Sequence, residues 1–290
     1  MVQFKSLQPL SSEYLPTEQD LPDSDNRPVD NELQLLVPTL LRAILALAWA
    51  DRTDWFLGVN LGLYYDPKQP AVGPDAFLSL GVPLYRPDKD LRLSYLLWEE
   101  GVVPQWALEV VSKKPGKEYD YKMQLYARLG VGYYVIYNPK YHQRDKHDVF
   151  EVYRLINGEY VRQSGNPVWM PEIGLGIGVS RGTHAALPPR DWLYWYDAAG
   201  NQYPAPENVI EQAQQAIRLA QQEAQAAQQE ARRSRQEAQE AQQEARWSRQ
   251  EARRSRQEAQ EAQQEAQLKQ RQMDEMLRKL CDRGIDPDTL

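Results

Sequence analysis

One apolar run gives this sequence its clearest structural signal: Gln105-Trp106-Ala107-Leu108-Glu109-Val110-Val111-Ser112-Lys113-Lys114. Its aromatic and aliphatic residues are typical of a strand covered on both faces of a sheet, and its end leads into a basic turn. Glu109 does not fit that pattern. Burying an unpaired carboxylate costs roughly several kcal/mol, so a buried Glu109 needs a metal ion or a cation as its partner. The alternative is a glutamate at the strand end, in solvent or in a structural ion pair.

A second acid lies upstream, in the run Gly73-Pro74-Asp75-Ala76-Phe77-Leu78, which predicts a turn followed by an apolar strand. Pro74 fixes its own φ and favours an extended neighbour, so Asp75 is expected where the strand starts. Mg²⁺ takes oxygen ligands and keeps several waters, so two carboxylates and a backbone carbonyl suffice to hold it. Asp75 and Glu109 form such a site if they converge, whereas a Pro-Asp pair taken alone is more often a turn.

A helix is predicted after the carboxylate strand, over residues 118–130, with a glycine as its C-terminal stop. Three- and four-residue spacing places Tyr119, Lys122 and Tyr126 on one face of this helix. Lys122 therefore stands on an otherwise aromatic and apolar face, either as a site residue or as a lysine that extends past Tyr126 to reach water. Residues 131–137 predict another strand, which an Asn-Pro pair ends.

Taken in order, these segments resemble the Uma-two family of bacterial endonucleases, a branch of the PD-(D/E)XK, or restriction-endonuclease-like, nucleases. The resemblance extends over residues 30 to 197. No single motif is specific, but the ordered set is. The motifs are Pro74-Asp75, Leu108-Glu109-Val110-Val111-Ser112, Lys122 with Tyr126, Gly130-Val131, and Tyr134-Val135-Ile136-Tyr137-Asn138-Pro139.

The resemblance implies an α/β fold, with a restriction-endonuclease-like mixed β-sheet core flanked by helices. It also implies hydrolysis of DNA, with Mg²⁺ or Mn²⁺ held by Asp75, Glu109 and the main-chain carbonyl of Val110. In that case Asp75, Glu109 and Lys122 are the catalytic residues.

The position of the lysine departs from the superfamily pattern, which puts it two residues after the acid, where this chain has Val111. In the Uma-two pattern the lysine comes from the following helix, and here that residue is Lys122. Lys113 competes with it, because an extended chain would place Lys113 on the same side as Glu109. We favour Lys122, since the polar and Pro-Gly residues over 112–116 are expected to end the strand first.

Two further acids are candidates for the site. The family often has an aspartate four residues before this lysine, and here that position is Glu118. The family's early helix often carries a polar or acidic residue near the site, and Glu32 is the only acid well placed for that role.

Composition and patterning divide the chain into five parts, the second of which extends over residues 30–203. In this second part, Asp30 is expected to cap a helix that runs to Asp51. In the same part, Asn157-Gly158 between two alternating runs predicts a β-hairpin. The aromatic cluster over 191–196 is interpreted as packing of a terminal helix, with base stacking as the alternative. Strands are also expected over 55–65 and 77–82, a strand or edge segment over 95–100, and a polar loop over 140–148. The five parts are an irregular N-terminal arm (1–29), a nuclease-like domain (30–203), a Pro-containing linker (204–206), a heptad coiled coil (207–281) and a C-terminal tail (282–290).

Residues 207–280 are rich in Gln, Ala, Glu and Arg and contain neither Gly nor Pro. The block that begins at Ala231 returns at Ala252, a period of 21 residues or three heptads. Small or apolar residues alternate at spacings of three and four, with one break at Lys269, which predicts a coiled coil and a homo-oligomer. An Ala/Ser seam buries little area, so association is expected to be weak, or close-packed and antiparallel. The alternative is a single solvated helix; either rod would be about 110 Å long.

Charge and composition bear on the expected DNA affinity, the cellular compartment and membrane association. The formal net charge is −7, and residues 1–206 carry 20 Lys/Arg against 25 Asp/Glu, which argues against tight non-specific DNA binding. Positive charge is nevertheless concentrated just beyond Glu109, which favours a metal-dependent site with limited DNA contact or one that needs a partner. The single cysteine, Cys281, fits a reducing, cytoplasmic setting. The most apolar helix is too short to cross a bilayer, so no membrane association is expected.

Three hypotheses follow. The first is an Mg²⁺-dependent DNA endonuclease, in which the metal activates a water and Lys122 positions it or stabilises the phosphate. The second is a catalytically inactive nuclease-like scaffold whose role is coiled-coil assembly. The third is a nucleic-acid-binding module without chemistry.

Overall fold

Six strands form the central sheet of this computed structural model, which describes residues 15–22, 31–87, 89–114 and 117–282. β5 and β6 run parallel and every other neighbouring pair runs antiparallel, so the sheet is mixed. This confirms the predicted mixed α/β fold. In spatial order the strands are β1 (Trp55–Val59), β3 (Ala76–Leu80), β5 (Trp106–Val110), β6 (Tyr133–Tyr137), β7 (Phe150–Ile156) and β8 (Glu159–Gln163).

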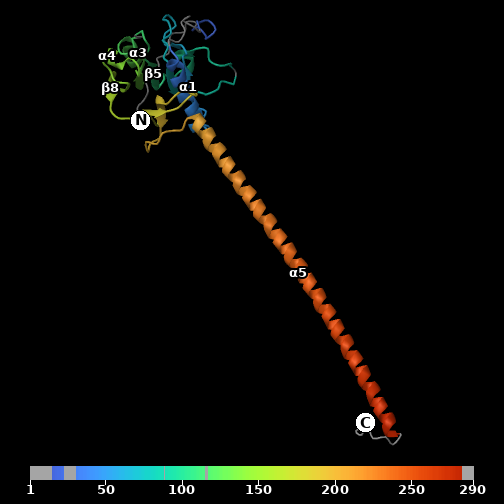
Figure 1. Ribbon diagram of the computed structural model, residues 1–290. Helices are drawn as coiled ribbons and strands as arrows, with labels where there is room; N and C mark the ends of the chain where they lie inside the picture. Colours follow the sequence, from blue (N-terminus) through green and yellow to red (C-terminus); the bar gives the residue numbers. More distant parts are fainter. Residues whose placement is uncertain (1–14, 23–30, 88, 115–116, 283–290) are drawn as a thin grey trace. The chain divides into compact units, whose positions relative to one another are not determined.

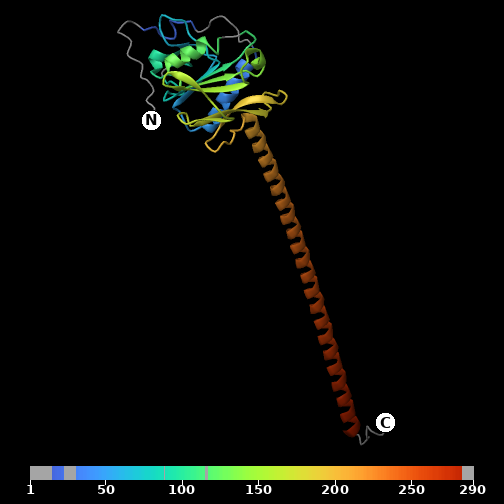
Figure 2. The same ribbon diagram turned by 90° about the vertical axis from the view of Figure 1, so that its left-hand side faces the viewer.

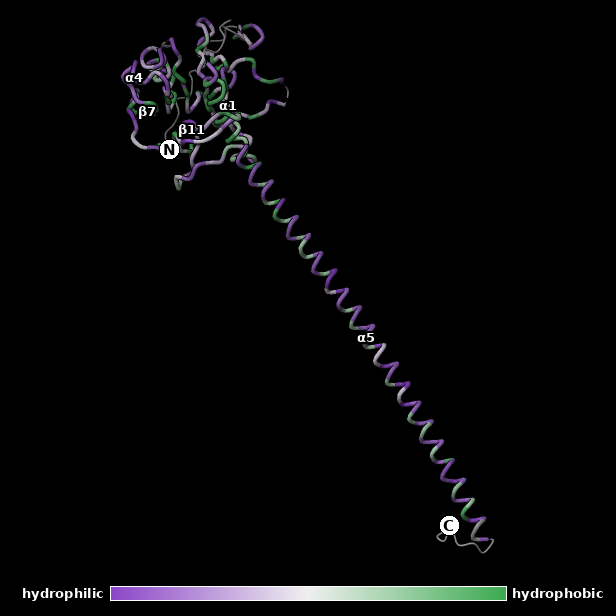
Figure 3. The backbone as a smooth tube through the Cα atoms, viewed as in Figure 1, coloured by the Kyte–Doolittle hydropathy of each residue, from purple (hydrophilic) through white to green (hydrophobic). Residues whose placement is uncertain are grey.

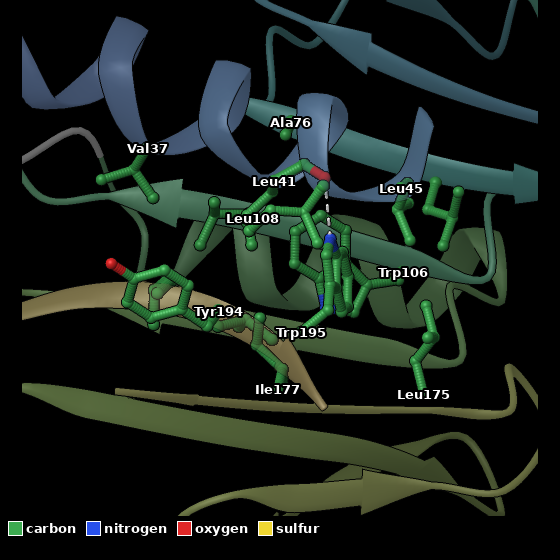
Figure 4. Close-up of a cluster of buried hydrophobic side chains, with 14 of the residues drawn as sticks. Val37, Leu41, Leu45, Ala76, Trp106, Leu108, Leu175, Ile177, Tyr194 and Trp195 are labelled. Carbon is green, nitrogen blue, oxygen red and sulfur yellow. Dashed lines mark hydrogen bonds between the residues drawn. The ribbon is translucent and has the colours of Figure 1, made fainter. Parts of the chain in front are cut away.

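One face of the sheet packs against helix α1 (Leu33–Ala48) and a second, three-stranded sheet. Trp195 joins the layers: its ring lies 5.0 Å from that of Trp106, and its Nε1 donates to the carbonyl of Leu41 at 3.0 Å (Figure 4). The tryptophan that begins β5, Trp106, is therefore fully covered, as the apolar pattern predicts. The second sheet consists of β9 (Val168–Met170), β10 (Leu175–Gly182) and β11 (Arg190–Tyr196), in the order β11-β10-β9.

The opposite face carries helix α3 (Tyr121–Leu129), so the central sheet lies between α1 and α3 (Figures 1 and 2). Asp120 caps α3 by accepting from the backbone N–H of Tyr121. Gly130 ends the helix in the left-handed region, with φ 89°, as the sequence predicts. The same face holds the short helix α2 (Leu97–Glu100) and the two-stranded parallel sheet of β2 (Leu63–Tyr64) and β4 (Tyr95–Leu96).

The predicted hairpin is present between β7 and β8. Ile156 pairs with Glu159, which leaves Asn157 and Gly158 as the two turn residues. Their φ values are 52° and 89°, the positive values that a two-residue turn of this hand requires.

Several predicted elements differ in the structure. The expected strand over 55–65 is broken after β1 by Asn60, whose φ is 47°. The segment 95–100 consists of the two-residue strand β4 followed by the four-residue helix α2. The expected loop 140–148 contains the one-turn helix α4 (His142–Asp145). The aromatic cluster over 191–196 is wrong as a helix: it forms strand β11. Its continuous aromatic run fits a strand because both faces of β11 are covered, and this burial also argues against base stacking.

The start of α1 differs from the prediction as well. The helix begins at Leu33 with Glu32 at its N-cap, and Asp30 lies outside the described residues. The described part of the N-terminal arm, residues 15–22, has no helix or strand but is held against the domain by side-chain contacts. Glu18 is buried in an ion pair with Arg86 at 2.9 Å, and Pro16 accepts from the Trp98 indole at 2.9 Å.

The chain forms two compact units, residues 1–212 and 213–290. Helix α5 (Pro206–Asp282) has 77 residues, which corresponds to about 115 Å. It includes every described residue of the second unit. Described side chains from 210 to 279 are exposed, and polar residues dominate its surface (Figure 3). The predicted long helix is confirmed, whereas its association stays a prediction. Within the described residues, no helix has both the length and the apolar character needed to cross a membrane.

Candidate active site

The pairing of β3 with β5 brings the two predicted acids to one place. In this antiparallel pair Ala76 lies opposite Leu108 and Phe77 opposite Ala107, so one further step of the same register sets Asp75 opposite Glu109. Side chains alternate between faces along a strand. Asp75 therefore shares a face with Phe77, and Glu109 with Ala107, and both of those residues belong to the core on the α3 side.

Asp75 is nearly buried, at 7% exposed, and its Oδ2 accepts from the backbone N–H of Val110 at 2.6 Å. Burial raises the pKa of Asp75 well above its ordinary value, and the negative charge of Glu109 raises it further. Hydrogen bonds from Val110 and from the Gln34 side chain, together with the charge of Lys122, oppose these effects. Asp75 is thus a carboxyl group held in place by the strand that carries the other acid.

Glu109 is 2% exposed, and both of its carboxylate oxygens have partners from α3. Oε2 accepts from Lys122 Nζ at 2.7 Å, and Oε1 accepts from the Tyr126 hydroxyl at 2.8 Å. Burial raises the pKa of Glu109, while Lys122 and Tyr126 partly offset the rise. The requirement that a buried Glu109 have a cationic partner is met by Lys122.

Lys122 links β5 to the loop that precedes β3 rather than extending free into solvent. Its amine donates to the Gly73 carbonyl at 3.1 Å in addition to Glu109, and its side chain is 20% exposed. Burial lowers the pKa of Lys122, but the charges of Glu109 and Asp75 outweigh burial and leave the pKa above its ordinary value. Lys122 therefore supplies a permanent positive charge between the two acids near neutral pH.

Gln34 is the site residue that the sequence did not suggest. Its Nε2 donates to the Val110 carbonyl at 3.3 Å, and its side chain also bonds Asp75. It is polar and lies in the first turn of a mainly apolar helix, and this position is the signal that could have identified it. Glu32, the predicted residue of this helix, is exposed at the N-cap, and no contact between Glu32 and these groups is found in the described part of the chain.

The other two predicted site residues, Lys113 and Glu118, differ in burial. β5 ends at Val110, and Lys113 is exposed in the following turn, where its carbonyl accepts from Arg144 at 2.6 Å. Glu118 is buried at 4% exposed, just before α3, and its charge raises the pKa of both Glu109 and Lys122. Glu118 thus belongs to the electrostatic surroundings of the pair.

The oxygen atoms gathered here suit Mg²⁺. Asp75, Glu109 and the carbonyl of Val110 are hard oxygen donors, and Mg²⁺ completes its shell with water. Within the described residues, no group of three or more His, Cys, Asp or Glu could hold a metal, so an all-protein zinc cage is not found there.

A comparison with protein families finds one match, over residues 26–188, to the family described as Uma2, "Putative restriction endonuclease". No curated protein and no solved structure gives a significant match. The matched residues include β3, β5, α3 and β6, the elements that carry the acids and the lysine or flank them. They are more than half of the chain, which therefore belongs to the Uma-two family of restriction-endonuclease-like proteins.

Proposed function

We propose that this protein is an Mg²⁺-dependent endonuclease that hydrolyses phosphodiester bonds in DNA. The observation that carries the proposal is the convergence of Asp75, Glu109 and Lys122 on one face of the sheet, within one network of hydrogen bonds. Family membership supports the same reaction class.

Each residue has a defined part in this proposal. Asp75, Glu109 and the Val110 carbonyl would hold Mg²⁺, or Mn²⁺ in its place. When bound, the ion would supply a more acidic water and positive charge against the phosphate. Lys122 holds its amine beside Glu109, where a fixed cation stabilises the negative charge that builds up on a phosphate under attack. Tyr126 keeps the Glu109 carboxylate in a single orientation.

DNA contact is proposed at the basic turn beyond β5. Lys113, Lys114 and Lys117 are exposed there, and Arg144 from α4 fixes the turn by donating to the Lys113 carbonyl. Because the first 206 residues are acidic as a whole, we expect a small footprint of phosphate contacts with weak affinity.

The test is nicking of supercoiled plasmid in the presence of Mg²⁺ or Mn²⁺. Wild type should relax the plasmid, and Asp75→Ala and Glu109→Ala should reduce the rate at least 100-fold, as is usual for loss of a central catalytic group. Glu159→Ala is the matched control, because Glu159 is an exposed acid on the edge strand β8. Absence of cutting with any divalent ion, or full activity in both site variants, would refute the proposal.

We also propose that residues 207–280 join copies of the chain. The exposed heptad face of α5 favours this, and it keeps a second candidate function open, that of an inactive scaffold built on the helix. Calorimetry separates the two functions: metal binding that disappears in Asp75→Ala supports the nuclease, and absence of metal binding supports the scaffold. DNA binding that does not depend on metal, without cleavage, would instead indicate a binding module.

A further inference from the structure

The charged residues beside the seam of α5 follow a strict pattern. Ile210 is assigned to heptad position a. Position g is then glutamate in seven successive heptads, and each of these glutamates is followed five residues later by an e position that is arginine or glutamine. No acid occurs at these e positions and no base at these g positions. The g residues are Glu223, Glu230, Glu237, Glu244, Glu251, Glu258 and Glu265, and the e residues are Gln228, Arg235, Gln242, Arg249, Arg256, Gln263 and Gln270.

This pattern distinguishes two directions of pairing. In a parallel pair each g residue lies next to the e residue of the partner's following heptad, whereas in an antiparallel pair g lies next to g and e next to e. Parallel pairing in register therefore puts every glutamate beside arginine or glutamine. Antiparallel pairing would put a row of glutamates beside a second row of glutamates, and arginines beside arginines.

The ion pairs within one helix complement this pattern. Glu237 and Glu258 are bound by the arginines four residues before them, each at 3.0 Å, and Glu265 by Lys269 at 2.8 Å. These three glutamates are among those that would face only glutamine in a parallel partner.

Three of the other g glutamates lack an ion pair within the described helix but would face arginine in a parallel partner. Glu230, Glu244 and Glu251 would face Arg235, Arg249 and Arg256 of a parallel partner, and no ion pair within one chain is found for them in the described part of the tail. Four residues before them stand Ala226, Glu240 and Trp247, none of which is a cation. Only Glu223 has no cation in either arrangement.

We infer that α5 pairs with α5 of a second copy of this chain, parallel and in register. The a and d positions are exposed in the single chain, including the large residues Ile210, Ile217, Met273 and Met276 near the two ends. Alanine and serine between them let two helices approach closely but bury little area per heptad. The charged flanks and the apolar ends therefore determine direction and register.

This inference does not depend on nuclease activity, but it adds to the proposed function. Each tail continues from its own domain at Gln212. A parallel pair thus starts from two domains at the same end of the coil, and, if the proposed function holds, two sites can act on one duplex.

Direction is tested by cysteine cross-linking of the full chain. In a Cys281→Ser background, Ala220→Cys and Ala262→Cys are made separately; both are d positions, 42 residues and thus about 63 Å apart. A parallel pair in register should form a disulfide-linked dimer in each variant alone. In an antiparallel pair at most one of the two can cross-link to itself, a result that would overturn the inference. Gln243→Cys, on the outer face, is the control for random collision.

A second measurement uses charge and needs no DNA. The triple variant Arg235→Glu, Arg249→Glu and Arg256→Glu replaces attractive Glu–Arg pairs by repulsive Glu–Glu pairs only in the parallel arrangement, because an antiparallel pair would merely exchange one like-charged row of e residues for another. It should therefore weaken a parallel dimer at least tenfold, as measured by sedimentation. The matched control changes Arg232, Arg246 and Arg253, outward b positions, to Glu and should leave the dimer intact. A wild-type mass of one chain, or of more than two, overturns the inference, as does equal behaviour of the two triple variants. A failed plasmid assay with the expected cross-links would overturn only the nuclease.

Discussion

The hydroxyl of Tyr126 on α3 donates to Oε1 of Glu109 on β5 at 2.8 Å, with both side chains buried. Tyr126→Phe removes this donor and leaves a buried carboxylate oxygen without it, at a cost of about 1–3 kcal/mol. We expect a plasmid-nicking rate about tenfold lower and a pH–rate profile moved to higher pH, because Tyr126 now lowers the pKa of Glu109. A variant that loses stability but keeps the wild-type profile would contradict a positioning role.

The ion pair between Lys122 and Glu109 should show strong coupling in stability. Lys122→Met leaves a buried acid without its cation, and we expect a loss of about 3 kcal/mol, the low end for a buried pair because the amine is partly exposed. Adding Glu109→Gln removes the unpaired charge, so the double variant should be more stable than Lys122→Met alone. Urea unfolding of the four proteins in the cycle measures this. Additive losses would show that the pair is not coupled.

Asp75 should make the folded domain less stable as pH rises. Its pKa is raised by burial and by Glu109, so the unfolded chain releases this proton at a lower pH than the folded domain does. The stability linked to this proton is complete below the unfolded pKa, about 3.9, and is lost as pH rises through the folded pKa. Asp75→Asn keeps an acceptor for the Val110 N–H but cannot ionise.

The Tm of Asp75→Asn should therefore exceed that of wild type by an amount that grows as pH rises above about 4 and levels off above the folded pKa. Each unit by which the pKa is raised corresponds to about 1.4 kcal/mol of this difference at its plateau. Thermal unfolding in buffer with a chelator measures the difference. A difference that does not change with pH would count against the raised pKa.

Metal binding at this site should release protons. The pKa values of Asp75 and Glu109 are both raised, and both groups must be carboxylates to hold a cation. We expect Mn²⁺ affinity to weaken as pH falls, by up to about tenfold per pH unit for each proton displaced. Calorimetry in two buffers of different ionisation enthalpy counts these protons. Glu159→Ala should titrate like wild type, and an affinity independent of pH would contradict the proposed ligands.

Gly58 should be needed for the packing of β1 on β3. It lies opposite Phe77, and a Cβ at position 58 would come within 2.4 Å of the Phe77 ring. We expect Gly58→Ala to destabilise the domain by about 1–3 kcal/mol through overpacking. Gly73→Ala, where nothing lies within 4 Å of the added Cβ, is the control. Equal urea midpoints for the two variants would show that the ring moves aside freely.

The sequence predicted the elements that carry the site because their signals are local. The β5 run, the glycine that ends α3 and the Asn157-Gly158 turn each depend on residues within one short segment. The shared face of Asp75 and Glu109 depends instead on the register between two strands, and alternation within each strand does not determine that register.

Contacts between distant segments were harder to foresee. Gln34 and Val110 are 76 residues apart and meet only because α1 packs on the sheet. One-turn helices such as α2 and α4 are too short to show a helical period. The aromatic run of β11 has no alternation, because it is covered on both sides, so its pattern did not separate strand from helix.

The 21-residue repeat of α5 has a consequence for alignment. The block over 231–245 recurs unchanged over 252–266, so two tails that slipped by one repeat would still match glutamate with arginine across it. Such a slip would move Ile210 and Ile217 opposite Ala231 and Ala238, and would leave one end of each helix without a neighbour. The ends of the tail that lie outside the repeat thus determine the register of the two helices. Shortening either end should yield dimers whose helices are displaced by one 21-residue repeat.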